Sequence, residues 1–289
     1  MKAYVFLVAT LLLNQLNAKE SCDIPPQSKH LIIQQNLLEL QKYLDIRRNY
    51  KTLQGLCIHL FAFREGNLVW KMFLVTNPKR GYGPFWFLPH DNENSAFDAA
   101  VYATRRYGGG FLSIMNGGHR YNMGQDPNRN FASSKHRLCS QQIAPSPHYT
   151  NFVFSIINYY KPPSYPYLAL HNNTNRGGIS ILKESPKTKS YLAYPRNQVK
   201  NGIGLSDEDS IVYIADSHPN PPQAKIQTLL NAGLNIKYEY VTAQNNDCSM
   251  SNYVVLGLGS ENYYNIEAQH GKTATQIEMI NRLIHLIQK

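Results

Sequence analysis

The chain has 289 residues, of which 43% are hydrophobic and 17% charged, and it contains 18 Gly and 16 Pro. This composition is that of a folded protein and excludes collagen, a coiled coil and a wholly disordered chain. The formal net charge of +10 favours anionic surroundings or partners. Nucleic acid, anionic envelope polymers and carboxylate-bearing substrates all fit that charge, which does not choose among them.

The first residues have the layout of a secretory signal peptide. Met1-Lys2 gives a short positive start, an uncharged and mostly apolar run covers residues 3–13, and Ala18 is a small residue before a cut at Lys19. The run is shorter than the roughly 20 residues of a membrane-spanning helix, which argues against a membrane anchor. We therefore expect a signal peptide over residues 1–18 and a single domain over residues 19–289. The mature chain would be periplasmic or secreted, with no stable membrane insertion.

The cysteines fit an exported protein. All four lie beyond the expected cut, and no two are close enough for a CxxC metal or redox motif. Four cysteines allow three disulfide pairings, and the sequence does not select one. Two disulfides and buried free thiols are both compatible with export. The residues concerned are Cys22, Cys57, Cys139 and Cys248.

Hydrophobic periodicity predicts alternating strands and helices. In the first half, a helix is expected over residues 31–46 and a β-hairpin is expected from strands at 57–63 and 68–76. A strand at 84–88 and a helix over 95–106 follow. Three glycines end that helix before a buried strand at 111–115. Residues 116–149 read as a long polar loop, a feature that is usually functional or mobile.

The second half of the chain continues the alternation. Two more helices are expected, at 222–232 and 273–288. The predicted strands are 167–171, 179–183, 211–216, 236–241, 253–258 and 263–268. Alternation of this kind indicates an α/β domain with a largely parallel or mixed sheet.

Chemistry-bearing side chains gather where the predicted strands end. His90 and Glu93 lie three residues apart between the strand at 84–88 and the next helix, and His171 ends the strand at 167–171. Two imidazoles and one carboxylate form a catalytic zinc set that leaves a fourth position open for water. Such a site also needs a general base near that water. Glu267, in the strand at 263–268, is the best-placed carboxylate.

These residues, in this order, resemble the zinc carboxypeptidase superfamily. His90-x-x-Glu93 is followed by an Asn-Arg pair in the segment Asp126-Pro127-Asn128-Arg129-Asn130-Phe131, then by His171 and Glu267. The match runs from about residue 85 to 270 and looks closest to the succinylglutamate desuccinylase and aspartoacylase branch. An HxxE motif alone is weak, whereas the ordered combination is much stronger. The resemblance implies a three-layer α/β/α fold with a central mixed sheet, and Zn²⁺ as cofactor.

Carried over residue by residue, the resemblance also implies roles. Asn128 and Arg129 would hold a substrate carboxylate, and guanidinium pairs with carboxylate in a bidentate fork that lysine cannot reproduce. Glu267 would act on the metal-bound water. Arg120 has a spacing similar to that of the family's oxyanion-stabilising arginine and is a weaker candidate, because its neighbours are not diagnostic. The zinc ligands would be His90, Glu93 and His171.

Taken singly, these residues have simpler explanations. A strand-end histidine is more often a surface or capping residue, and Glu93 alone could interact with the macrodipole of the helix that follows it. Arg129 alone would be a solvated loop charge. Glu267 is less easily explained, because a buried unpaired carboxylate is costly. We interpret Asp216 as a turn residue at a strand end. The histidines interpreted as surface or capping residues are His119, His136, His148, His218 and His270.

Two classes of function remain. The first is an exported zinc-dependent hydrolase that cleaves an amide bond next to a free carboxylate. Its substrates would be peptides, including cell-wall peptides, or N-acyl amino acids, and export favours peptides modestly. The second is a non-catalytic binder of anionic polymers, which would be expected to have lost at least one of the four site residues. Nucleic-acid binding is not expected, because Lys and Arg are dispersed and no recognition motif occurs.

Overall fold

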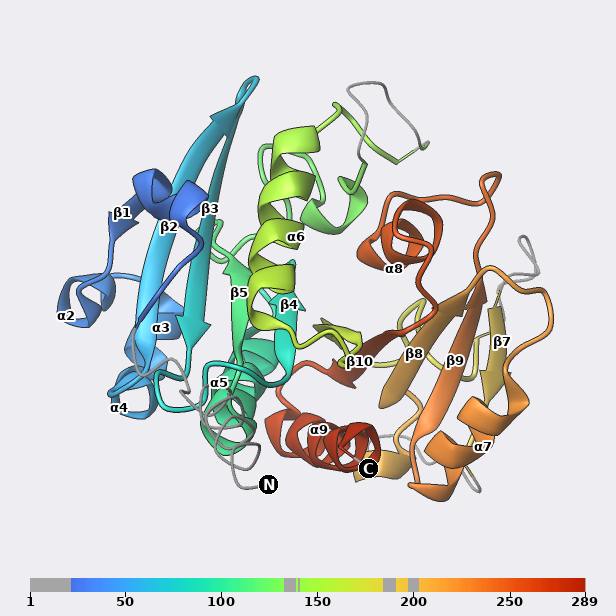
Figure 1. Cartoon of the computed structure of the whole chain (residues 1–289). Helices are drawn as coiled ribbons and strands as arrows, with labels where there is room; N and C mark the ends of the chain where they lie inside the picture. Colours follow the sequence, from blue (N-terminus) through green and yellow to red (C-terminus); the bar gives the residue numbers. More distant parts are fainter. Residues whose placement is uncertain (1–21, 133–138, 140, 184–190, 197–202, 289) are drawn as a thin grey trace, which may run out of the picture.

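The computed structural model describes residues 22–132, 139, 141–183, 191–196 and 203–288 (Figure 1). The predicted signal peptide, residues 1–18, lies outside the described residues. None of the described helices has the length and apolar character needed to cross a bilayer.

The described strands form one ten-stranded sheet in the order β1-β2-β3-β5-β4-β6-β10-β8-β9-β7. At its centre β5, β4, β6 and β10 are parallel to one another, whereas β10 pairs antiparallel with β8. The predicted α/β class and mixed sheet are therefore confirmed. The strands are β1 (Ile32–Gln34), β2 (Cys57–Glu65), β3 (Leu68–Thr76), β4 (Phe85–Leu88), β5 (Gly110–Ile114), β6 (Tyr167–Asn173), β7 (Tyr191–Tyr194), β8 (Ile211–Asp216), β9 (Asn235–Tyr240) and β10 (Tyr263–Gln269).

Helices cover both faces of this sheet. In Figure 1, α5 (Asn94–Tyr107) and α9 (Thr273–Ile287) lie below the central strands, and α6 (Pro147–Tyr160) and α8 (Met250–Asn252) lie above them. Two buried apolar clusters fill the spaces between the layers, one on the side of α5 and α9 and one on the side of α6. The remaining helical segments are η1 (Pro26–Leu31), α2 (Leu37–Leu40), α3 (Leu44–Arg48), α4 (Tyr50–Leu53), η2 (Pro127–Arg129), η3 (Gly204–Ser206), α7 (Gln223–Asn231) and η4 (Tyr253–Gly257).

Alternation along β6 decides which side chains reach the candidate site. Leu168 and Leu170 pack in the cluster beside α5 and α9, whereas Ala169 packs in the cluster beside α6. Because successive side chains of a strand point to opposite faces, His171 lies on the same face as Ala169. The strand is parallel to β4 and β10, so its carboxyl end lies at the same edge of the sheet as theirs.

Three predicted elements are wrong. The helix predicted over 31–46 is replaced by β1 and short helices, because Ile32 and Gln34 pair with β2 and the Asn36 side chain caps a new helix. The strand predicted at 179–183 is a pair of turns, with Lys183 N donating to Ser180 O. The strand predicted at 253–258 is the π-helical turn η4, which continues α8.

Two further elements are absent from the sequence prediction. Helix α6 begins at Pro147, inside the predicted loop over 116–149, and β7 pairs antiparallel with β9 at one edge of the sheet. Helix α6 is amphipathic, and its buried side chains Phe152, Val153, Ile156 and Ile157 fill the cluster on that face. Its exposed polar residues His148, Asn151 and Asn158 recur at helical spacing, so the segment has a helical period that the loop prediction overlooked.

The structure selects one of the three disulfide pairings. Cys22 is bonded to Cys57 and Cys139 to Cys248, and no described cysteine is free. The first bond ties the start of the described chain to β2. The second ties the predicted loop to the segment before α8, where Cys248 O also accepts from Phe131 N at 3.0 Å.

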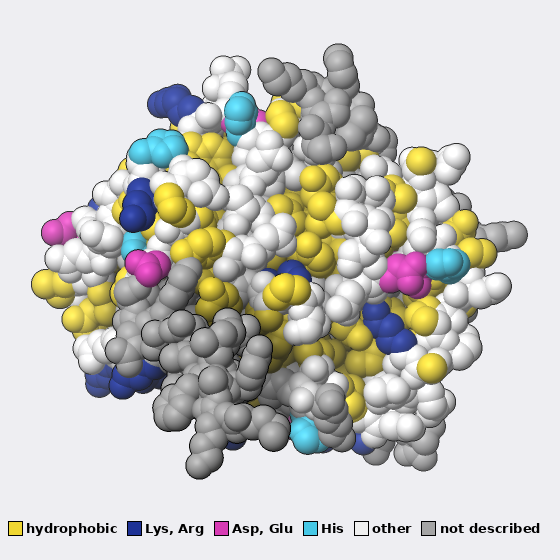
Figure 2. Space-filling view, viewed as in Figure 1, with side chains coloured by type: hydrophobic (Ala, Val, Ile, Leu, Met, Phe, Trp, Pro, Cys, Tyr) yellow, Lys and Arg dark blue, Asp and Glu magenta, His cyan; other side chains and the backbone are white. Residues whose placement is uncertain are grey.

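Positive charge is spread over the surface shown in Figure 2. The Lys and Arg side chains of the described residues form separate groups on this face, and apolar side chains lie between them. On this face, therefore, the basic residues are not gathered into one patch.

Candidate metal centre

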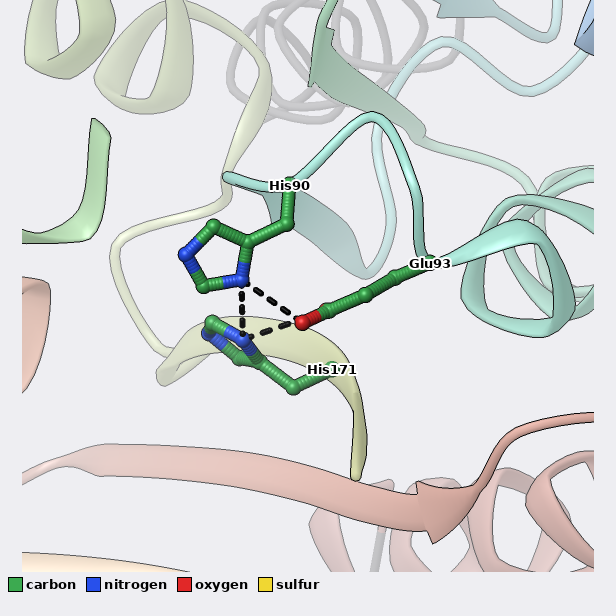
Figure 3. Close-up of side chains that lie close together, drawn as sticks. All are labelled: His90, Glu93 and His171. Carbon is green, nitrogen blue, oxygen red and sulfur yellow. Dashed lines mark hydrogen bonds and ion pairs between the residues drawn. The ribbon is translucent and has the colours of Figure 1, made fainter. Parts of the chain in front are cut away.

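Three side chains converge at the carboxyl edge of the central strands. His90 and Glu93 lie in the turn between β4 and α5, His171 lies on β6, and their polar atoms point toward one another (Figure 3). The Nδ1 atom of His90 is 2.7 Å from Glu93 Oε1 and 3.2 Å from the Nδ1 atom of His171. His171 Nδ1 is 3.3 Å from Glu93 Oε2. The three groups form a compact N, N, O set that could hold a metal ion.

This set is buried, and its charges are balanced internally. His90, Glu93 and His171 are 3%, 3% and 4% exposed. Burial alone would raise the pKa of Glu93, but His90 and His171 outweigh it and hold that pKa well below its ordinary value. Burial lowers the pKa of His90, and the Glu93 and Asp126 carboxylates more than compensate, so that the pKa is raised. The carboxylate is therefore ionised at neutral pH.

Asp126 and Arg120 surround the set. His90 Nε2 is 2.8 Å from Asp126 Oδ1, which leaves the Nδ1 atom of this ring facing Glu93 and His171. The Arg120 guanidinium is 3.2 Å from Glu93 Oε1 and 3.1 Å from Asp126 Oδ2. Glu93 is the N-cap residue of α5, but its side chain makes no capping hydrogen bond. Glu93 therefore stands at the start of α5, as the helix-dipole explanation requires, and its carboxylate contacts the two imidazoles as well.

Asn172 joins four elements directly beside the set. Its backbone N–H donates to Glu93 Oε2 at 2.9 Å, and its side-chain oxygen accepts from Ala96 N, in α5, at 2.9 Å. Its Nδ2 donates to Gln276 Oε1, in α9, at 2.9 Å and to Ala268 O, in β10, at 3.3 Å. The residue fixes the start of α5 relative to β6, and so fixes Glu93 relative to His171.

Glu267 lies on β10, the neighbouring parallel strand. It is the register partner of His171, and its side chain accepts a hydrogen bond from Asn265 Nδ2 at 3.0 Å. Burial raises the pKa of Glu267 and nearby Glu93 adds to the rise, whereas His171 opposes it. The structure thus places this buried carboxylate next to the three converging side chains, as the sequence predicts.

Asn128 and Arg129 line the walls of two adjoining cavities. One, of about 480 Å³, contains the three converging side chains and Glu267, and the other, of about 270 Å³, extends from Glu267 and Arg129 toward β8 and β9. The Asn128 side-chain oxygen accepts from Met250 N at 3.1 Å. The Arg129 guanidinium contacts Asp247 at 3.3 Å and Asn128 O at 2.8 Å. Both side chains are therefore anchored at the boundary between the cavities.

Sequence reasoning missed several residues of this site. Asp126 was part of the motif, but its contact with His90 spans 36 positions and has no local signal. Tyr213 and Tyr263 line the smaller cavity, and nothing in the sequence distinguishes them among 20 tyrosines. The i, i+2, i+4 spacing of Tyr263, Asn265 and Glu267 on one strand is a signal that could have identified that face.

We expect Asn172→Ala to lower the free energy of unfolding by about 3 kcal/mol, because it leaves buried partners such as Ala96 N without a hydrogen bond. Urea unfolding followed by circular dichroism measures this change. Asn231→Ala, at an exposed position at the end of α7, is the matched control and should change stability by about 0.5 kcal/mol or less. Equal effects of the two substitutions would contradict the structural role of Asn172.

No protein-family model and no curated protein matches the sequence. Among solved structures, similar chains are a candidate metallopeptidase from Shewanella amazonensis (13% identity, 84% of this chain and 91% of that chain, TM-score 0.46) and a succinylglutamate desuccinylase/aspartoacylase from Rhodobacter sphaeroides (12% identity, 81% and 65%, TM-score 0.41). A third is a candidate carboxypeptidase A from Shewanella denitrificans (10% identity, 84% and 69%, TM-score 0.41). These neighbours carry names from the superfamily and branch that the sequence motifs resemble.

Proposed function

We propose that the chain is an exported zinc-dependent hydrolase that cleaves an amide bond next to a free carboxylate. The observation that carries this proposal is the buried convergence of His90, Glu93 and His171 with Glu267 on the adjacent strand, at the wall of a cavity of about 480 Å³. A carboxylate held beside a metal-binding set and open to a cavity is the arrangement that metal-assisted hydrolysis requires.

The three side chains fit zinc. Zinc bonds to nitrogen and oxygen are about 2.0–2.2 Å long, so neighbouring ligand atoms of a tetrahedral site lie about 3.3 Å apart. The separations of 3.2 Å between the two Nδ1 atoms and 3.3 Å between His171 Nδ1 and Glu93 Oε2 agree with that value, whereas His90 Nδ1 and Glu93 Oε1 lie at a hydrogen-bond distance of 2.7 Å. A metal-binding histidine usually has a carboxylate or carbonyl bound to its other ring nitrogen. Asp126 occupies that position, since its Oδ1 contacts Nε2 of His90.

Glu267 is proposed as the general base. A bound zinc ion supplies an acidic water and polarises a carbonyl. The Glu267 carboxylate, held by Asn265, would accept the proton of the attacking water and pass it to the leaving amine. Burial, which raises the pKa of Glu267, makes its carboxylate a stronger base toward the water than one in bulk solvent.

The cations near this site have different positions and different proposed roles. Arg129 and Asn128 stand where the two cavities meet and would hold the free carboxylate of the substrate. Because Arg129 contacts Asp247, that carboxylate would compete with Asp247 for the guanidinium. The Arg120 side chain is 37% exposed and lines the larger cavity, but it is bound to Glu93 and Asp126, so an oxyanion would compete with these carboxylates for the guanidinium.

Peptides are the favoured substrates. The smaller cavity adjoins Arg129 and is lined by polar groups, including Lys237, Glu239 and Ser251, which suits a polar side chain on the residue released. The two disulfides support export, where peptide C-termini, including those of cell-wall peptides, are accessible. Deacylation of N-acyl amino acids is the second candidate reaction, because its substrates also carry a free carboxylate that Asn128 and Arg129, the proposed carboxylate clamp, would hold. The periplasm or the cell exterior is the proposed location.

The metal content of the purified chain is the first test. We expect about one zinc per chain by mass spectrometry of the metal, and none in the double variant His90→Ala/His171→Ala. His148→Ala/His285→Ala, which removes two exposed histidines elsewhere, should keep the zinc. A folded chain that neither contains zinc nor takes it up would refute the proposal.

We expect Glu267→Gln to reduce kcat by a factor of about 10²–10⁴ on a peptide substrate, because the amide cannot accept the proton of the water. Zinc content should be unchanged, since Glu267 is not one of the three converging ligands. Glu278→Gln on α9, which removes an acid from a solvent-exposed pair with Arg282, is the matched control. Undiminished turnover by the Glu267 variant would exclude it as the base.

The carboxylate clamp is tested by Arg129→Lys. Loss of a charge-assisted hydrogen bond of about 1.5–3 kcal/mol should lower kcat/KM roughly 10–100-fold for a peptide with a free C-terminus. A peptide with an amidated C-terminus should be a poor substrate for both chains and should respond far less to the substitution. Equal losses on the two peptides would show that Arg129 does not recognise the carboxylate.

A further inference from the structure

A second group of carboxylates lies outside the His90, Glu93 and His171 set, in the segment just before β8. Asp207, Glu208 and Asp209 are consecutive in the chain, and all three are buried. One carboxylate oxygen from each lies within 4.8 Å of the others. Three buried acids so close together repel one another, and an isolated buried charge is costly.

The carboxylate of Glu208 has no adequate partner among the described residues. Its side chain is 0% exposed, and neither of its oxygens accepts a hydrogen bond; Asp209 Oδ1 accepts none either. The neighbouring cation is Arg176, whose Nε is 3.7 Å from Glu208 Oε1 and whose side chain is largely exposed. One solvated guanidinium at that distance does not balance three buried carboxylates.

A neutral oxygen near the three acids is also without a partner. Asn173 is buried at the end of β6, and its Nδ2 donates to the backbone carbonyl of Asp209 at 2.9 Å, which places the amide against the acidic segment. Its side-chain oxygen accepts no hydrogen bond from a described residue. Like-charge crowding does not account for this second kind of unpartnered oxygen, whereas a bound cation accounts for both.

We propose that Asp207, Glu208, Asp209 and Asn173 bind a calcium ion. Their donors are all oxygens, the ligands that Ca²⁺ takes six to eight of, from carboxylates, amide carbonyls and water. Calcium–oxygen distances of about 2.3–2.6 Å allow two ligand oxygens of one ion to lie up to about 5 Å apart, so three carboxylate oxygens within 4.8 Å of one another are close enough to share an ion. No histidine or cysteine joins this group in the described residues, so its chemistry differs from that of the zinc set.

The ion would hold one wall of the substrate cavity. Arg176 N donates to Asp209 Oδ2 at 2.7 Å, and Ile181 N donates to the carbonyl of Glu208 at 2.9 Å, so the segment after β6 is tied to the acids. That segment contributes residues 177–179 to the cavity lining. Calcium would therefore order this wall without contacting the zinc ligands, and the proposal does not depend on the hydrolase assignment.

Calcium binding is measured on the full chain after removal of metals with a chelator. Titration with CaCl₂ in a calorimeter should show about one site per chain. Free Ca²⁺ at 100 times the dissociation constant should raise Tm by about 5 °C. Glu208→Gln should weaken binding at least 10-fold and abolish that rise. In chelator alone this variant should be as stable as the parent or more so, because it removes a buried charge.

Two controls and a second variant locate the site. Glu278→Gln, on α9, and Glu261→Gln, at an exposed residue beside His218, should keep the calcium response. Asp209→Asn is a second variant that should lose it, in case Glu208→Gln fails to fold. The proposal is overturned if 10 mM Ca²⁺, roughly ten times the dissociation constant of the weakest extracellular sites, gives no heat and no Tm shift. A response lost in a control but kept in Glu208→Gln, or an equal response to Mg²⁺, also overturns it.

Discussion

The buried Glu93 carboxylate is the group on which the site depends most. It contacts two imidazoles, the Arg120 guanidinium and the backbone N–H of Asn172, all of which are groups that can donate a hydrogen bond to it. An ionised group this deep is stable only with such partners. The turn after β4, the start of α5 and the end of β6 must therefore keep their relative positions, because each supplies one of those contacts.

Parallel pairing of the central strands keeps these segments in their relative positions. Strands β4, β6 and β10 end at one edge of the sheet, and the exact register of Glu267 with His171 sets the two side chains on one face. A slip of one residue would move Glu267 to the face that packs against α5 and α9, where Ile266 and Ala268 lie. The buried apolar residues before and after Glu267 therefore hold the strand register, and with it the position of the Glu267 side chain, as firmly as the polar contacts do.

Sequence reasoning succeeded where a pattern is local. The strand at 68–76 agrees with β3 at both ends, and the helix before the three glycines agrees with α5 within one residue, because alternation, periodicity and glycine act over short distances. Residues 253–258 failed because Tyr253, Val254 and Val255 favour strands intrinsically, whereas Ser249 caps a helix whose valines pack in the core. The four site residues could be named from a motif, but contacts such as that of Asp126 with His90 depend on the fold.

The cavity charges bear on the choice between a hydrolase and a binder of anionic polymers. The two cavities are lined by four carboxylates and three cations, although the whole chain has a formal charge of +10. A surface that binds a polyanion concentrates Lys and Arg and excludes acids. Here Glu93 and Glu267 lie beside the proposed metal, and the cations Arg120, Arg129 and Lys237 are spread over the two cavities rather than gathered into one cluster. That arrangement suits one carboxylate-bearing end of a small substrate, and it gives a long anionic chain no continuous path.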